Sequence, residues 1–140
     1  MRFLGVDYGG SRTGLALSDP LGITCGPVGT IHEKDEDVLV GRVLEAAVEN
    51  SVTMIVVGLP RPLSGGSNAQ SEAAMAFKER LESKTSIPVK MWDERFTSKL
   101  ADRGRERKSG AAHKGEQDAV AACYMLQSYL DSRTQLTEDS

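Results

Sequence analysis

The chain has 140 residues, of which 39% are hydrophobic and 26% charged, and its net charge is −3. This length fits one domain with a core that needs no disulfide staples, and the composition is that of a globular protein. No apolar stretch approaches the roughly 20 residues that span a bilayer. The segment 1–5 also lacks the apolar region of a signal peptide, so we expect a cytoplasmic protein without a membrane segment.

The two cysteines and two histidines show no metal-binding pattern. Cys25 and Cys123 are far apart and form no C-x-x-C motif, so we expect two buried thiols that act as small apolar residues. His32 and His113 have neither helical spacing to each other nor a cysteine nearby. This spacing argues against a zinc site.

Closely spaced strands are expected in the first thirty residues. The segments are 3–7, 14–18 and about 23–31, and glycine-bearing turns separate them. This spacing favours an antiparallel meander. A helix over Asp35–Asn50 follows, with acidic residues in its first turn and with Leu39, Val43 and Ala47 in one apolar stripe.

The second half alternates strands and helices. The apolar run 54–57 is typical of a strand buried on both faces, and the glycine- and proline-rich segment 58–66 indicates a loop. A helix is expected to begin at Ser67, because Ser67 and Gln70 match a capping box, and its buried stripe would be Ala73, Phe77 and Leu81. A fifth strand is expected over 87–92, then a basic segment from 99 to 114, and a last helix over about 117–132.

This order predicts an α/β fold. Three antiparallel strands followed by helix, strand, helix, strand and helix imply a five-stranded mixed sheet, whose last two strands are parallel and reached by right-handed crossovers. The order matches the ribonuclease H-like fold. We expect one domain over residues 1–132, with a polar tail over 133–140 that frays.

Asp7 is the first residue that calls for a chemical explanation. It ends the first strand and, by alternation, shares a face with Phe3 and Gly5. A first strand flanked on both sides places this carboxylate near the sheet centre, where an ionised group needs a cation or hydrogen-bond donors. The alternative is that Asp7 caps the turn at Gly9 and Gly10.

Asp118 and the pair Asp93-Glu94 are further candidates. Asp118 begins the apolar face of the last helix, although it could also serve the helix dipole. Asp93 and Glu94 lie where the fifth strand ends, which is where ligand sites gather in open α/β sheets. They point to opposite faces, so only one joins Asp7, and the periodicity leaves the choice open.

Three carboxylates at one sheet edge suit Mg²⁺ or Mn²⁺, since hard cations prefer oxygen ligands. Two such ions activate water and stabilise the attacking and leaving oxygens of a phosphodiester. Arg12, Arg95 and Lys114 lie close in sequence to the acids and are candidates for binding phosphate. Gly9 and Gly65 are candidates for the close approach of backbone to a phosphate, although hairpin geometry alone could account for such glycines.

Together these motifs resemble the YqgF family, also called RuvX, over nearly the whole chain. The resemblance rests on four segments: 7–19 (DYGGSRTGLALSD), 55–60 (IVVGLP) with a glycine at 65, 93–97 (DERFT), and 114–122 (KGEQDAVAA) continuing to 130. It implies a metal-dependent nuclease with Asp7, Glu94 and Asp118 as catalytic acids and metal ligands. It favours Glu94 over Asp93.

The resemblance also implies a substrate. Family members are described as nucleases that trim the 5′ side of pre-16S rRNA, leaving 5′-phosphate and 3′-hydroxyl ends, and as Holliday-junction resolvases by similarity to RuvC. We therefore expect precursor rRNA as the partner, with branched DNA as the alternative and a monomer or homodimer as the assembly. A non-catalytic RNA- or ribosome-binding module is a third reading, and a phosphotransferase is disfavoured because it needs two such domains.

Overall fold

The computed structural model describes residues 1–60, 66, 68–96 and 114–139. Its elements in chain order are β1 (Phe3–Asp7), β2 (Arg12–Ser18), β3 (Cys25–His32), α1 (Glu36–Glu49), β4 (Met54–Leu59), α2 (Ala69–Lys84), β5 (Val89–Asp93), the 3₁₀ turn η1 (Glu94–Phe96) and α4 (Lys114–Asp139). The expected basic segment 99–114 lies outside the described residues, apart from the backbone of Lys114.

The sheet confirms the predicted mixed topology. Five strands lie in the order β3-β2-β1-β4-β5, with β1 at the centre. β1 pairs antiparallel with β2, and β2 with β3, whereas β4 is parallel to both β1 and β5. This arrangement puts the carboxyl ends of β1, β4 and β5 at one edge of the sheet, which is where ligands bind in open α/β folds.

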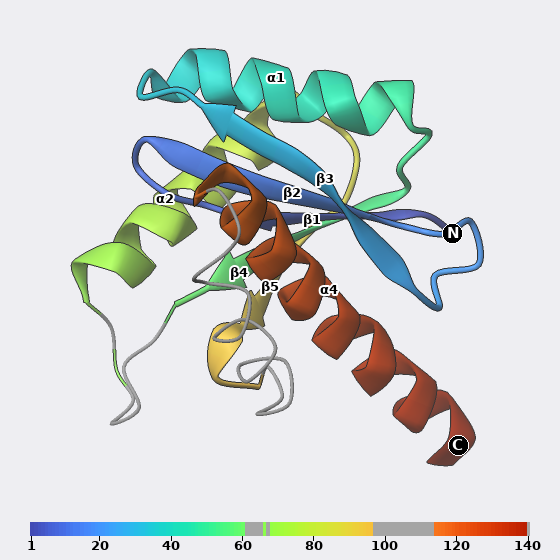
Figure 1. Cartoon of the computed structure of the whole chain (residues 1–140). Helices are drawn as coiled ribbons and strands as arrows, with labels where there is room; N and C mark the ends of the chain where they lie inside the picture. Colours follow the sequence, from blue (N-terminus) through green and yellow to red (C-terminus); the bar gives the residue numbers. More distant parts are fainter. Residues whose placement is uncertain (61–65, 67, 97–113, 140) are drawn as a thin grey trace.

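Helices cover both faces of the sheet. α1 and α2 lie on one face, and α4 crosses the other on a diagonal (Figure 1). The side chains of β1 divide between the two layers, since Leu4 and Val6 pack towards α1 and α2 and Phe3 packs towards α4. Asp7, which follows in the same alternation, therefore faces α4, as the sequence pattern predicted.

α1 lies within the predicted range, and both of its ends are capped. Asp35 is its N-cap and accepts a 3.1 Å hydrogen bond from the Val38 amide, while Asn50 is its C-cap. An aspartate at this position satisfies an amide that the helix leaves without a partner. The predicted stripe is buried as expected, and Val40 joins it.

α2 begins later than the sequence predicted, and the predicted capping box is wrong. Asn68 is the N-cap, and it exchanges hydrogen bonds with Ser71. Gln70, the expected partner in the capping box, therefore takes no part in the cap. The buried face also shifts, since Ala74 rather than Ala73 packs with Phe77. The helical period allows either residue on that face, and only the position of α2 on the sheet selects one.

α4 is longer than predicted, because it continues through the expected tail to Asp139. Arg133 explains part of this extension. Its guanidinium lies over the rings of Phe3 and Tyr129, 4.9 and 5.9 Å from their centres, so the first residue after the predicted helix end still contacts the core layer under α4. Within the described residues, no helix is both long and apolar enough to span a membrane.

Candidate active site

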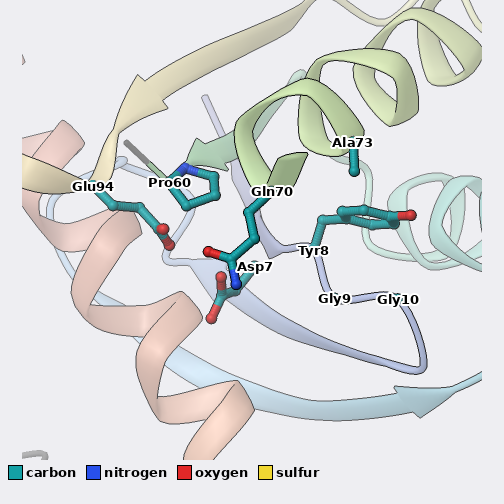
Figure 2. A pocket seen from close by; sticks show the side chains of 8 residues that line it. All are labelled: Asp7, Tyr8, Gly9, Gly10, Pro60, Gln70, Ala73 and Glu94. Atoms are coloured by element: carbon teal, nitrogen blue, oxygen red, sulfur yellow. The ribbon is translucent and has the colours of Figure 1, made fainter. Parts of the chain in front are cut away.

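Asp7 ends the central strand and lines a cavity of about 320 Å³ at the carboxyl edge of the sheet. The cavity is bounded by residues of four segments: Asp7, Tyr8, Gly9 and Gly10 after β1, Pro60 after β4, Gln70 and Ala73 of α2, and Glu94 of η1. Figure 2 shows the carboxylates of Asp7 and Glu94 directed into this space. Asp7 is half-buried, so its charge is only partly solvated.

Glu94 lies over the neighbouring strand β4, at a glycine. A Cβ on Gly58 would come within 2.9 Å of Oε1 of Glu94 and 3.2 Å of its Cδ. The absence of a side chain at this strand position therefore leaves the space that the glutamate occupies. This contact explains structurally why a buried, otherwise apolar strand carries a glycine near its carboxyl end.

Asp93 has a different role from Glu94. Its carboxylate accepts hydrogen bonds from the backbone amide of Arg95 at 2.9 Å and from the Arg95 guanidinium at 2.7 Å. The hydrogen bond to Asp93 raises the pKa of Arg95. Of the two acids between which periodicity left the choice open, Glu94 lines the cavity, and Asp93 holds the turn that carries it.

Asp118 lies in the first turns of α4 and is brought to the sheet by another glycine. A Cβ on Gly14 would meet the backbone oxygen of Asp118 at 2.0 Å, so α4 packs directly on the backbone of β2. Gly14 is the cross-strand partner of Asp7. Asp118 of α4 therefore lies beside the carboxyl end of β1.

Asp7 thus lies between two glycines on one face of the sheet. On the β2 side Gly14 makes room for the backbone of Asp118. On the β4 side Val6 pairs with Val57, so Gly58 follows one position beyond, and its space holds Glu94. Because neighbouring strands lie about 4.8 Å apart, this arrangement brings the side chain of Glu94 and the backbone of Asp118 to the two sides of Asp7.

The carboxylate of Asp118 forms an ion pair with Arg12. The Nε of Arg12 lies 3.2 Å from Oδ2 of Asp118, and the two side chains are 39% and 24% exposed. The two atoms lack the alignment of a hydrogen bond, and among the described residues this buried oxygen accepts none. No three His, Cys, Asp or Glu side chains in the described ranges come together as a ready-made metal cluster.

The predicted phosphate-binding residues have different outcomes. Arg12 and Arg95 both lie beside the acids, but each is engaged by an aspartate. The side chain of Lys114 lies outside the described residues, and so does Gly65. Gly9 lines the cavity, yet a Cβ there would meet the Arg12 carbonyl oxygen at 2.2 Å, so the hairpin itself requires this glycine.

Sequence reasoning missed two polar side chains of the cavity wall, those of Gln70 and Tyr8. Gln70 was interpreted as a capping residue, but Figure 2 shows its amide directed into the cavity with Asp7 and Glu94. Tyr8 stacks on Phe77 with ring centres 4.5 Å apart, and its hydroxyl donates to Glu36. Burial and the bond to Glu36 raise the pKa of Tyr8 to about 12. One signal could have identified Gln70 as a residue of the site. It lies in the first turn of α2, the helix that follows the parallel strand β4, and ligands bind at that end of such strands.

Comparison with known proteins shows the family to which the chain belongs. The family model RuvX, described as Holliday junction resolvase, matches residues 1–132. A Clostridium acetobutylicum protein named "Putative pre-16S rRNA nuclease" is 40% identical over 134 residues, which is 94% of this chain and 99% of that protein. A Koribacter versatilis protein of the same name is also 40% identical, over 94% of this chain and 88% of that protein.

Solved structures show the same fold. Thermus thermophilus RuvC in complex with a Holliday junction substrate superposes with a TM-score of 0.64 at 15% identity, over 96% of each chain. A Fowlpox virus resolvase bound to Holliday junction DNA gives a TM-score of 0.58 at 13% identity, over 95% of this chain and 99% of the other. The ribonuclease H-like fold is thereby confirmed, and the chain belongs to the RuvX family of nuclease-fold proteins.

Proposed function

We propose that this protein is a metal-dependent endonuclease that cleaves nucleic-acid phosphodiesters, with the 5′ side of pre-16S rRNA as its substrate. The observation that carries the proposal is the placement of Asp7 between Gly14 and Gly58, with the backbone of Asp118 in the space at Gly14 and the side chain of Glu94 in the space at Gly58. Acidic residues placed close together at the carboxyl edge of a sheet destabilise the fold, because their charges repel and are partly desolvated. Such a cost is typical of functional sites.

The residues present suit a divalent cation. Asp7, Glu94 and Asp118 provide carboxylate oxygens, which are the donors that Mg²⁺ and Mn²⁺ prefer. Oδ2 of Asp118 is buried and, among the described residues, accepts no hydrogen bond, so it has capacity for a positive charge beyond its pairing with Arg12. A cation held by these three acids supplies a polarised water and neutralises charge at the scissile phosphate.

The remaining residues bind and orient the substrate. Arg12 already lies beside Asp118 and supplies a guanidinium suited to a phosphate oxygen. Arg95, held by Asp93 at the start of η1, places a second cation next to Glu94. Gln70, on the opposite wall of the cavity, offers an amide that can orient a water or a phosphate oxygen.

The proposal of an RNA substrate rests on the relatives. The proteins from Clostridium acetobutylicum and Koribacter versatilis carry a pre-16S rRNA nuclease name at 40% identity over almost the full chain. Resolution of Holliday junctions is the second candidate, because the matching family model bears that description. A resolvase cuts two symmetric strands and so needs a two-fold dimer, whereas a processing nuclease does not.

The decisive experiment compares the two substrates directly. Purified protein is incubated with Mg²⁺ or Mn²⁺ and end-labelled pre-16S rRNA 5′ leader, and in parallel with a four-way DNA junction. We expect metal-dependent cleavage of the RNA, which Asp7→Asn abolishes. Asp37→Asn is the matched control, since Asp37 lies 84% exposed on α1 and its variant loses the same charge outside the site.

The outcomes separate the candidate functions. Paired nicks in the junction with intact RNA would establish the resolvase. Binding of RNA without cleavage of either substrate would leave a binding module as the function. Equal cleavage by wild type and Asp7→Asn, with both proteins folded, would remove Asp7 from the catalytic site.

A further inference from the structure

The structure brings together the two cysteines of the chain, which the sequence separates by 98 positions. Cys25 begins β3, the edge strand, and Cys123 lies on α4, one turn and a half after Asp118. Their sulfur atoms are 3.1 Å apart, close enough for one thiol to donate to the other. Both side chains are half-buried, which differs from the fully buried thiols expected from the sequence.

The surrounding contacts fix this approach. The Sγ of Cys25 lies 3.1 Å from the Cys123 carbonyl oxygen, and the Sγ of Cys123 lies 3.4 Å from the Cys25 carbonyl oxygen. One turn further along α4, Gln127 donates a 2.8 Å hydrogen bond to the carbonyl oxygen of Ile23. Two separate points of α4 therefore contact the chain at the start of β3 and just before it, in addition to the contact between the two sulfurs.

We propose that Cys25 and Cys123 are a redox modification site, at which a low-molecular-weight disulfide such as oxidised glutathione converts the two thiols into a reversible intrachain disulfide. A disulfide bond requires the sulfurs to approach to about 2.05 Å. From the 3.1 Å in the structure, the sulfurs must approach by about 1 Å to reach that distance. The proposal is independent of the nuclease assignment, because it concerns α4 and β3 and not the cavity.

The exchange balances with oxidised glutathione as the only co-reactant. One cysteine thiolate attacks a sulfur of the reagent, so the first glutathione leaves as a thiol after it takes up a proton, and a mixed disulfide forms. The second cysteine loses its proton and attacks the protein sulfur of that mixed disulfide, which releases the second glutathione. The protein loses two hydrogen atoms and two electrons, and one glutathione disulfide becomes two thiols.

The first step of the exchange should be slow and the second step fast. The hydrogen bond with Cys123, followed by burial, raises the pKa of Cys25. Little of the Cys25 thiol is therefore ionised at neutral pH, so an attack by Cys25 is slow. Once a mixed disulfide forms, the second thiol is already in contact with it, so the intrachain step is fast and glutathione does not remain attached.

The bond would clamp α4 to the sheet. It closes a loop of about a hundred residues, which restricts the unfolded chain far more than the folded one. It would also hold the helix that carries Asp118 against the β2–β3 hairpin, whose first residue Arg12 pairs with that acid. The oxidised protein should therefore unfold at a temperature several degrees higher than the reduced protein.

The test uses the folded full-length protein in glutathione redox buffers, with intact-mass measurement after the thiols are trapped by alkylation. We expect wild type to lose two hydrogen atoms, to retain no glutathione and to stay monomeric on a non-reducing gel, with recovery on reduction. Cys25→Ser and Cys123→Ser are the matched variants. Each should instead accumulate one bound glutathione, because the resolving thiol is missing.

Three results would overturn the proposal. The first is a folded wild type that keeps both thiols in a buffer in which the urea-unfolded chain forms the bond. The second is wild type that retains glutathione as the serine variants do. The third is oxidation that yields disulfide-linked dimers and no intrachain product. A higher unfolding temperature of oxidised wild type, absent from both serine variants, would confirm that the bond joins α4 to β3.

Discussion

The backbone oxygen of Asp118 lies 2.0 Å from the point where a Cβ on Gly14 would stand. This contact fixes the distance between α4 and β2, and through it the position of the third acidic residue beside Asp7. The atom that a side chain would displace belongs to the backbone of a helix, which cannot move without its neighbours. Gly14 is therefore as necessary to the site as the acids themselves.

Replacement of Gly14 tests this contact. Gly14→Ala should lower the free energy of unfolding by about 1–3 kcal/mol, the cost of overpacking a close contact, and should strongly reduce cleavage because α4 is displaced. Gly26→Ala is the control, since a Cβ at Gly26 on β3 meets nothing within 4 Å. Chemical denaturation and cleavage assays measure the two effects. A Gly14→Ala protein as stable and active as Gly26→Ala would contradict the close approach.

Replacement of Gly58, unlike that of Gly14, should affect activity much more than stability. A Cβ there meets only the flexible end of Glu94, at 2.9 Å, and that side chain can swing away. Gly58→Ala should therefore change stability by less than about 1 kcal/mol while lowering the cleavage rate roughly 10- to 100-fold, because the carboxylate is displaced. The measurement is kcat beside a denaturation curve. A loss of stability as large as that of Gly14→Ala would show that the strand, and not the glutamate, gives way.

The two acids at the end of β5 should respond differently to neutralisation. Glu94→Gln removes a carboxylate that lines the cavity and should abolish cleavage. Asp93→Asn loosens Arg95, whose guanidinium it holds at 2.7 Å, so it should mainly raise KM. Steady-state kinetics of the two variants separate these effects. Abolished turnover in Asp93→Asn together with near-normal turnover in Glu94→Gln would reverse the assignment.

Arg12 should affect substrate binding more than stability. Its ion pair with Asp118 is partly exposed, and exposed pairs contribute about 0–1 kcal/mol. Arg12→Gln should therefore leave the unfolding transition almost unchanged, weaken nucleic-acid binding, and reduce the slope of affinity against salt concentration by about 1. Binding titrations at several salt concentrations check this expectation. An unchanged slope would mean that Arg12 serves Asp118 and does not contact phosphate.

Tyr8 should titrate above the ordinary pKa of a tyrosine. Burial and the hydrogen bond to Glu36 raise its pKa to about 12, above the ordinary value of 10.0. The folded state favours the neutral phenol, so the stabilisation from Tyr8 is complete below the unfolded pKa and is lost as the pH rises from about 10 to about 12. Ultraviolet titration of wild type against Tyr8→Phe isolates this group. A phenol that ionises near pH 10 in the difference curve would contradict the contact with Glu36.

Local pattern was enough for most of the secondary structure. The acidic first turn and the apolar stripe predicted α1 over Asp35–Asn50, and the helix spans Glu36–Glu49. The same reasoning failed at α2, where Ser67 and Gln70 fit the capping pattern as well as Asn68 and Ser71 do. The choice between two overlapping boxes depends on how the helix packs on the sheet, which local sequence does not encode.

By itself, the sequence determined the order of strands and helices, the mixed sheet, and the face on which Asp7 lies, because alternation and helical period are properties of the local chain. Periodicity left open which acid at the end of β5 enters the cavity, although the family resemblance favoured Glu94, and the tertiary structure places Glu94 there. Only the tertiary structure decided that Gln70 lines the cavity and that two distant cysteines meet. The physical reason is that these relationships depend on the close approach of backbones at Gly14 and Gly58 and on the angle at which α4 crosses the sheet. Those distances arise from packing between elements, and no periodicity along the chain reports them.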